Sequence, residues 1–185
     1  MTNLIEKNEK NHHHSQSITF RLDDIILNKL HREAEQKDIS VNTLVSHIIR
    51  RHIDWHSNAA KAGFVTVRRG LLSNLINQLP EKEISSVAEY IAKNETKDFV
   101  LLLRNQYNIE SALDVIETWI KISGYPYRHE VKHNLHSYVI QHDMGKNWSH
   151  YMAELYRFFF EEFGLKRTEF DLNHNTLDFI VDTER

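Results

Sequence analysis

The chain has 185 residues, of which 41% are apolar and 26% charged, and its formal net charge at pH 7 is −3. These proportions are typical of a globular protein, and the length allows one domain or two small ones. No run of eighteen apolar residues occurs, which argues against a membrane span, and the polar start lacks the apolar core of a secretory signal. The absence of cysteine excludes disulfides and cysteine-ligated metals, so we expect a cytoplasmic protein.

The chain begins with a polar stretch followed by a short alternating segment. Residues 1–16 are rich in Asn, Lys and Glu and contain the run His12–His14, which predicts a disordered arm. Residues 17–22 alternate between apolar and polar side chains, which is typical of a β-strand with two different faces. The apolar face carries Ile18, Phe20 and Leu22, and the polar face carries Ser17, Thr19 and Arg21.

Two helices are expected directly after this strand. Asp23 is a good N-cap for the first helix, which has an apolar stripe of Leu27, Leu30 and Ala34. Asp38 stands in the turn between the helices, where it tolerates a left-handed backbone better than most residues. Ser40 then caps a second helix, which extends to about His52 and is apolar over a wide face.

The predicted strand has no second strand at hairpin distance. Its backbone N–H and C=O groups therefore need a partner from elsewhere. The simplest partner is the same segment of another copy, which predicts an intertwined homodimer with a two-stranded antiparallel ribbon. A ribbon of this size fits the major groove of double-stranded DNA.

A second domain is expected after a linker of small and polar residues at 57–63. We predict that residues 64–185 form an α+β domain that acts as a sensor or in oligomerisation, with helices followed by a ββαββ antiparallel sheet. Residues 97–104 fit either a buried helix or a strand, and helix is favoured. The other expected elements are an extended piece at 64–67, helices at 70–79, 80–91, 109–123 and 148–163, and hairpins at 127–132 with 137–142 and at 168–172 with 176–181.

Residues 17–56 resemble the ribbon-helix-helix family of DNA-binding proteins, the Arc, MetJ and CopG type. The resemblance depends on the strand polarity, the two helix lengths and the segment Ile39–Val45. It implies that the outward strand residues read base edges and that the start of the second helix anchors phosphates. These positions are Ser17, Thr19 and Arg21 for the bases, and Ser40, Val41 and Asn42 for the phosphates. Asp38 departs from the glycine that is common in this turn.

The charge balance counts against a DNA-binding protein, because such proteins are often basic. Residues 17–56 contain six basic and six acidic residues, and residues 146–185 contain five basic and eight acidic residues. The acidity therefore lies outside the expected DNA-binding domain. Backbone amides at a helix start can also hold a phosphate without any side-chain charge.

The sequence predicts a homodimeric, sequence-specific transcriptional regulator associated with the nucleoid. Two dimers on adjacent half-sites would explain its specificity, and the C-terminal domain is the candidate site for a small-molecule effector or a protein partner. Two alternatives remain: an antitoxin-type protein whose second domain binds a protein partner, and a ribbon that serves only for dimerisation. No enzyme, catalytic residue or cofactor is expected, because the chain lacks a Gly-rich phosphate loop, a nucleophile elbow and an HExxH motif. No metal site is expected either; His129 and His133, which would share a strand face, are the weak candidates.

Overall fold

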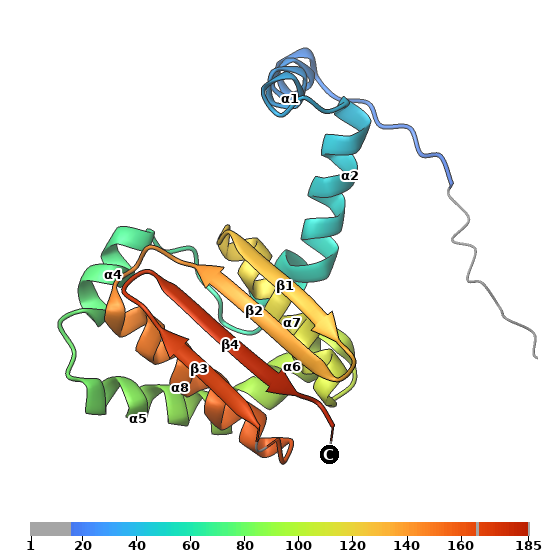
Figure 1. The fold of residues 1–185 in the computed structure, drawn as a ribbon. Helices are drawn as coiled ribbons and strands as arrows, with labels where there is room; N and C mark the ends of the chain where they lie inside the picture. The colour runs from blue at the N-terminus through green and yellow to red at the C-terminus, as the bar shows by residue number, and fades with distance from the viewer. Residues whose placement is uncertain (1–15, 166, 185) are drawn as a thin grey trace, which may run out of the picture. The chain divides into compact units, whose positions relative to one another are not determined.

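The computed structural model describes residues 16–165 and 167–184, which form two compact units divided between Ser46 and His47 (Figure 1). Apart from Gln16, the predicted polar arm lies outside the described residues. The fold is mixed α+β, with helices along most of the chain and an antiparallel sheet at its C-terminal end. No described helix combines the length and apolar character needed to cross a bilayer.

The N-terminal unit contains an extended segment followed by two helices. Residues 16–22 lie outside any helix or strand, and α1 (Asp24–Gln36) follows directly. Asp23 caps α1 as predicted, because its Oδ1 accepts a hydrogen bond from the Ile26 amide at 2.8 Å. The helix α2 (Val41–Arg51) begins after a short turn and continues past Ser46 into the second unit.

The turn between α1 and α2 confirms the expected backbone conformation of Asp38. Its φ is 52°, in the left-handed region, and the Ile39 amide donates to the Ala34 carbonyl at 3.0 Å. Helical structure continues beyond α2 into a π-helical turn (His52–His56) and α3 (Ser57–Ala59), so the predicted linker begins as helix. The unit boundary at Ser46 lies upstream of the predicted linker because Trp55 and Ala59 are buried in the C-terminal unit.

The C-terminal unit contains the remaining helices, which agree with the predicted positions. Residues 97–104, whose pattern fitted either a helix or a strand, are helical. Val100 is buried on one side of this helix, whereas Leu102 on another side is partly exposed. The segment 64–67 is not part of the sheet. The helices are α4 (Arg69–Ile76), α5 (Glu81–Asn94), α6 (Thr96–Arg104), α7 (Ile109–Ser123) and α8 (Lys146–Glu162).

Four antiparallel strands form one sheet in the order β1-β2-β4-β3, with α8 inserted between the two hairpins, as the predicted ββαββ pattern requires. The strands are β1 (Tyr127–Lys132), β2 (Leu135–Gln141), β3 (Thr168–Leu172) and β4 (Thr176–Asp182). A row of rings crosses all four strands on the inner face, with neighbouring centroids 3.9 to 5.8 Å apart. The row consists of His129, Tyr138, Phe179 and Phe170.

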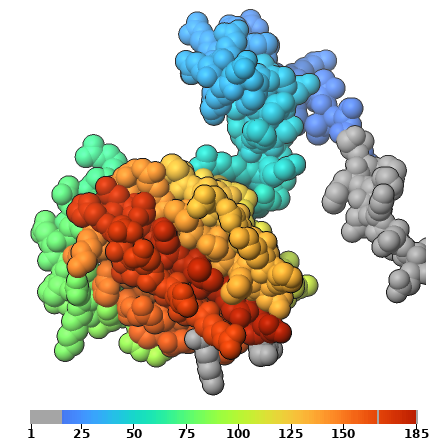
Figure 2. Space-filling view, in the orientation of Figure 1, coloured from blue at the N-terminus to red at the C-terminus, as the bar shows by residue number. Residues whose placement is uncertain are grey.

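Helices cover only one face of the sheet (Figure 1). α8 packs on β3 and β4, and α5 packs along α8. Because side chains alternate along a strand, Phe179 is buried in the core while its neighbour Ile180 is 39% exposed on the other face. Figure 2 shows that outer face, on which no described helix or strand of the C-terminal unit lies.

The buried imidazole of His142 makes the stability of the C-terminal unit sensitive to pH. Its Nδ1 accepts from the Met144 amide at 3.1 Å, so Nε2 carries the proton and donates to the Ser149 hydroxyl at 2.8 Å. The Ser149 hydroxyl donates in turn to the Asn173 carbonyl at 2.6 Å. Burial, with smaller effects of the His174 and Arg69 charges, lowers the pKa of His142 to about 4 although Asp143 opposes the change.

We expect acid to destabilise the protein through His142. A histidine whose pKa is lower in the folded than in the unfolded state contributes its full stability above the unfolded pKa of 6.5 and loses it as the pH falls towards 4. Between pH 6.5 and 5 the unfolding free energy should decrease by about 2 kcal/mol. Urea unfolding across this range measures the change, and His142→Gln should flatten it. An equally steep decrease in the variant would assign the acid sensitivity to other groups.

Candidate nucleic-acid interface

The segment that was predicted to form the ribbon is extended and exposed. All residues from 17 to 22 are exposed, and none pairs with another strand within residues 16–165 and 167–184. Ile18 is 74% exposed and Phe20 is 53% exposed, although both are large apolar side chains. The segment therefore has unpaired backbone groups and an uncovered apolar face.

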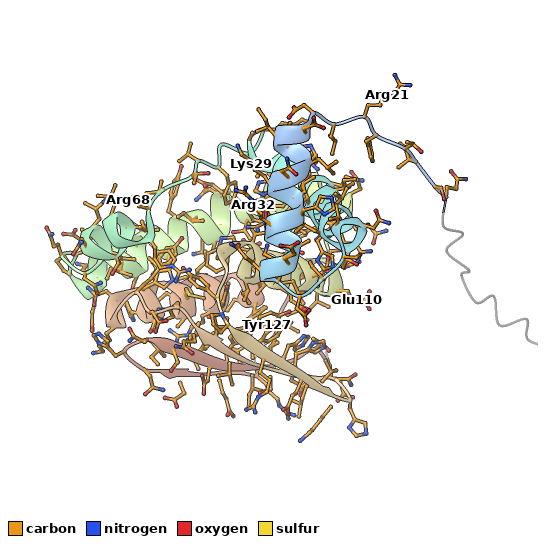
Figure 3. All side chains as sticks on the ribbon, turned by 90° about the horizontal axis from the view of Figure 1, so that it is seen from above. Arg21, Lys29, Arg32, Arg68, Glu110 and Tyr127 are labelled. Carbon is orange, nitrogen blue, oxygen red and sulfur yellow. The ribbon has the colours of Figure 1, made fainter. Side chains whose placement is uncertain are left out.

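Three basic side chains lie on this segment and the helix after it. Figure 3 shows Arg21 directed away from the chain trace, and Lys29 and Arg32 on α1. Within the described part of the chain, none of the three forms an ion pair. Their charges are thus free to attract an anionic partner such as the phosphate backbone of DNA.

The start of α2 presents free backbone donors. The Ser40 hydroxyl oxygen accepts a hydrogen bond from the Thr43 amide at 3.1 Å, which caps the helix as predicted. The amides of Val41 and Asn42 have no acceptor among residues 16–165 and 167–184. Such amides, at the positive end of the helix dipole, are suited to hold an anion.

The structure corrects the predicted pairing of two histidines on a strand. His133 lies in the two-residue turn between β1 and β2, with φ 57°, and so does not share a strand face with His129. The turn is shorter than predicted because β2 begins at Leu135, which places His136 on the strand. As a result, His129 Nε2 lies 3.1 Å from His136 Nδ1.

Glu117 on α7 completes a small polar cluster with these two histidines. Its carboxylate lies 3.2 Å from His129 Nδ1 and accepts from the Tyr127 hydroxyl at 2.8 Å. Burial alone would raise the pKa of Glu117, but the hydrogen bonds from Lys121 and Tyr127 outweigh it and the pKa is lowered. Burial and the nearby His129 charge lower the pKa of His136.

This cluster is a linear chain of contacts and not a set of converging ligands. Both nitrogens of His129 already face other side chains, one towards Glu117 and one towards His136. Across the described ranges, no group of three or more His, Asp or Glu side chains is arranged to hold a metal ion. The cluster instead joins α7 to the edge of the sheet.

A cleft in the C-terminal unit was not predicted from the sequence. It has a volume of about 1000 Å³, and its walls come from the segment before α4 and from α4 to α8. Several aromatic residues of α8 lie in the core of the unit, and some of them also line the cleft. The sequence carries no local signal for the cleft, because its lining residues are separated by up to about a hundred positions.

Comparison with known proteins found no matching family model, no matching curated protein and no matching solved structure.

Proposed function

We propose that the protein is a homodimeric, sequence-specific DNA-binding regulator. In this proposal the segments 17–22 of two copies pair as an antiparallel ribbon in the major groove. Ser17, Thr19 and Arg21 read base edges, and the start of α2 anchors phosphates through Ser40, Val41 and Asn42. The C-terminal unit then serves as a sensor or as a second contact between copies.

The observation that carries the proposal is the exposed apolar surface of the N-terminal unit. Of its described residues, 16–46, only Ala34 and Leu44 are buried apolar residues. Six large apolar side chains in the same unit are at least 37% exposed, which is unfavourable for a unit of this size alone. They are Ile18, Phe20, Leu22, Ile25, Ile26 and Leu27. A second copy would bury them and would also supply the missing strand partner.

The polar groups supply the second part of the argument. Arg21 is the residue best suited to a bidentate contact with guanine O6 and N7. The free amides of Val41 and Asn42 lie at the end of α2 where a phosphate is stabilised by the helix dipole. Base contacts and phosphate contacts are both needed, since phosphates set the register of a protein on DNA and bases determine its specificity.

Selection of bound sequences from random duplex DNA tests the proposal. We expect a consensus with two-fold symmetry, and a binding constant that decreases steeply with salt because basic side chains release counterions. Arg21→Ala should weaken binding to the selected site by about a hundredfold, since a dimer loses two contacts of about 1–3 kcal/mol each.

The matched control is Arg128→Ala, which removes an exposed arginine from β1 of the C-terminal unit and should leave DNA affinity unchanged. A dimer that selects no consensus, or whose affinity does not depend on Arg21, would show that the ribbon serves only for dimerisation.

A further inference from the structure

We infer that the cleft of the C-terminal unit binds a small apolar carboxylate, an aromatic or aliphatic acid. Its volume of about 1000 Å³ is at the upper end of the range for small-molecule sites. Every lining residue belongs to the C-terminal unit, and the cleft is partly open to solvent. This inference goes beyond the proposed DNA binding and does not depend on it.

The walls of the cleft are mainly aromatic and aliphatic. Rings contribute from three directions: the segment before α4, the helices α6 and α7, and the helix α8. Such walls favour the apolar body of a ligand through burial of surface. The ring-bearing residues include Phe64, Phe99, Trp119, Tyr125, Trp148 and Tyr151.

Two lining residues carry buried polar groups that form no hydrogen bond of normal geometry with the described residues: the hydroxyl of Tyr156 and the indole N–H of Trp148. The two residues are only 4% and 6% exposed, and the Trp148 N–H has the Tyr125 hydroxyl as its near polar neighbour. Burial raises the pKa of Tyr156 well above its usual value, so its hydroxyl remains a donor. A buried donor without an acceptor costs about 1–3 kcal/mol, which a ligand oxygen would remove.

A guanidinium lies against the Tyr125 ring, which also lines the cleft. Arg69 at the start of α4 has its Cζ 5.0 Å from the centre of the Tyr125 ring, and its Nη2 donates to the Ser123 carbonyl at 3.0 Å. These contacts fix the guanidinium at the cleft while leaving other N–H donors free. The Tyr125 hydroxyl itself donates to Met144 Sδ at 2.9 Å.

The other charged residues of the cleft favour one orientation of the ligand. Glu95 and Asp98, at the start of α6, line the cleft and would repel a carboxylate there. Lys61 also lines it, but its Nζ lies 3.4 Å from Asn58 Oδ1. The carboxylate is therefore placed at Arg69, where a guanidinium can form two parallel hydrogen bonds with it.

Isothermal titration calorimetry with 1-naphthoate and with decanoate tests the inference on the full-length protein. We expect at least one of them to bind with one molecule per chain. Arg69→Gln should weaken binding of that acid about tenfold, and should not affect the matching alcohol, 1-naphthylmethanol or decanol. The matched control Arg68→Gln, at the adjacent position outside the cleft, should bind the acid like the wild type.

A second pair of variants tests the unpartnered donors. Tyr156→Phe and Trp148→Phe each remove a donor while keeping a ring, and each should weaken binding of the acid by about fivefold. Tyr156→Phe should not lower the melting temperature of the free protein, because it removes a buried donor that has no acceptor. Absence of binding by both acids at millimolar concentration, or equal loss in Arg68→Gln and Arg69→Gln, would overturn the inference. No DNA is present in these titrations, so their failure is distinct from failure of the proposed DNA binding.

Discussion

Replacing Phe20 with Glu is expected to convert the proposed dimer into a monomer. In the single chain Phe20 is 53% exposed, so the substitution removes almost no contact within its own subunit. In a ribbon dimer two Phe20 rings would be buried, each contributing about 2 kcal/mol, and two carboxylates would take their place. We expect the dimer dissociation constant to increase at least a thousandfold, as measured by sedimentation equilibrium.

Thr19→Glu is the matched control for this experiment, because Thr19 neighbours Phe20 on the opposite face of the segment. It introduces the same charge and should leave the dimer intact, while repulsion from phosphates and base edges removes DNA binding. If Phe20→Glu remains a dimer, or if the wild type is already a monomer, the paired ribbon is wrong, and with it the proposed function.

Replacing Phe179 with Ala is expected to destabilise the C-terminal unit by about 3–5 kcal/mol. Phe179 is 1% exposed and lies at the centre of the ring row, 4.7 Å from Tyr138 between centroids. It also contacts the α8 side of the core, with its ring centroid 5.3 Å from that of Tyr156. Truncation leaves a cavity between the sheet and α8 that these rigid rings fill poorly.

Ile180→Ala provides the comparison one position along β4. Its side chain lies on the outer face of the sheet and is 39% exposed. We therefore expect Ile180→Ala to decrease the free energy of unfolding by less than about 1 kcal/mol. Urea unfolding followed by tryptophan fluorescence measures the stability change in both variants, since all three tryptophans lie in residues 47–184. If the two variants lost similar amounts of stability, the core could not lie on only the α8 side of the sheet.

Periodicity was sufficient for the sheet and the helices because each of these elements buries one face. The sequence predicted a strand at 176–181, and the structure shows β4 there with Leu177, Phe179 and Val181 buried on one side. The sequence also predicted the left-handed Asp38, since a two-helix turn without glycine needs a residue that tolerates positive φ. Local rules succeed where the local pattern and the tertiary contact agree.

The histidine prediction failed because it depended on the position of a turn. Residues 133–136 read equally well as a longer turn, and only the pairing of Lys132 with Leu135 fixes a two-residue connection. That register places His136 on β2, whereas His133 stays in the turn, outside the strand 127–132 that was predicted and observed. A shift of two residues in a hairpin therefore changes which imidazole faces His129.

The sequence alone determined the α+β class, the capped helix pair and the ββαββ order, because each depends on spacing within a few consecutive residues. Tertiary structure alone decided the position of the cleft and of the charged residues that line it. Arg69, Tyr125 and Trp148 lie far apart in sequence, and they line the same cleft only because α4, the end of α7 and α8 pack together. It also decided that segment 17–22 finds no partner within the described chain. The physical reason is that packing between distant segments depends on the summed burial of many side chains, which no short pattern contains.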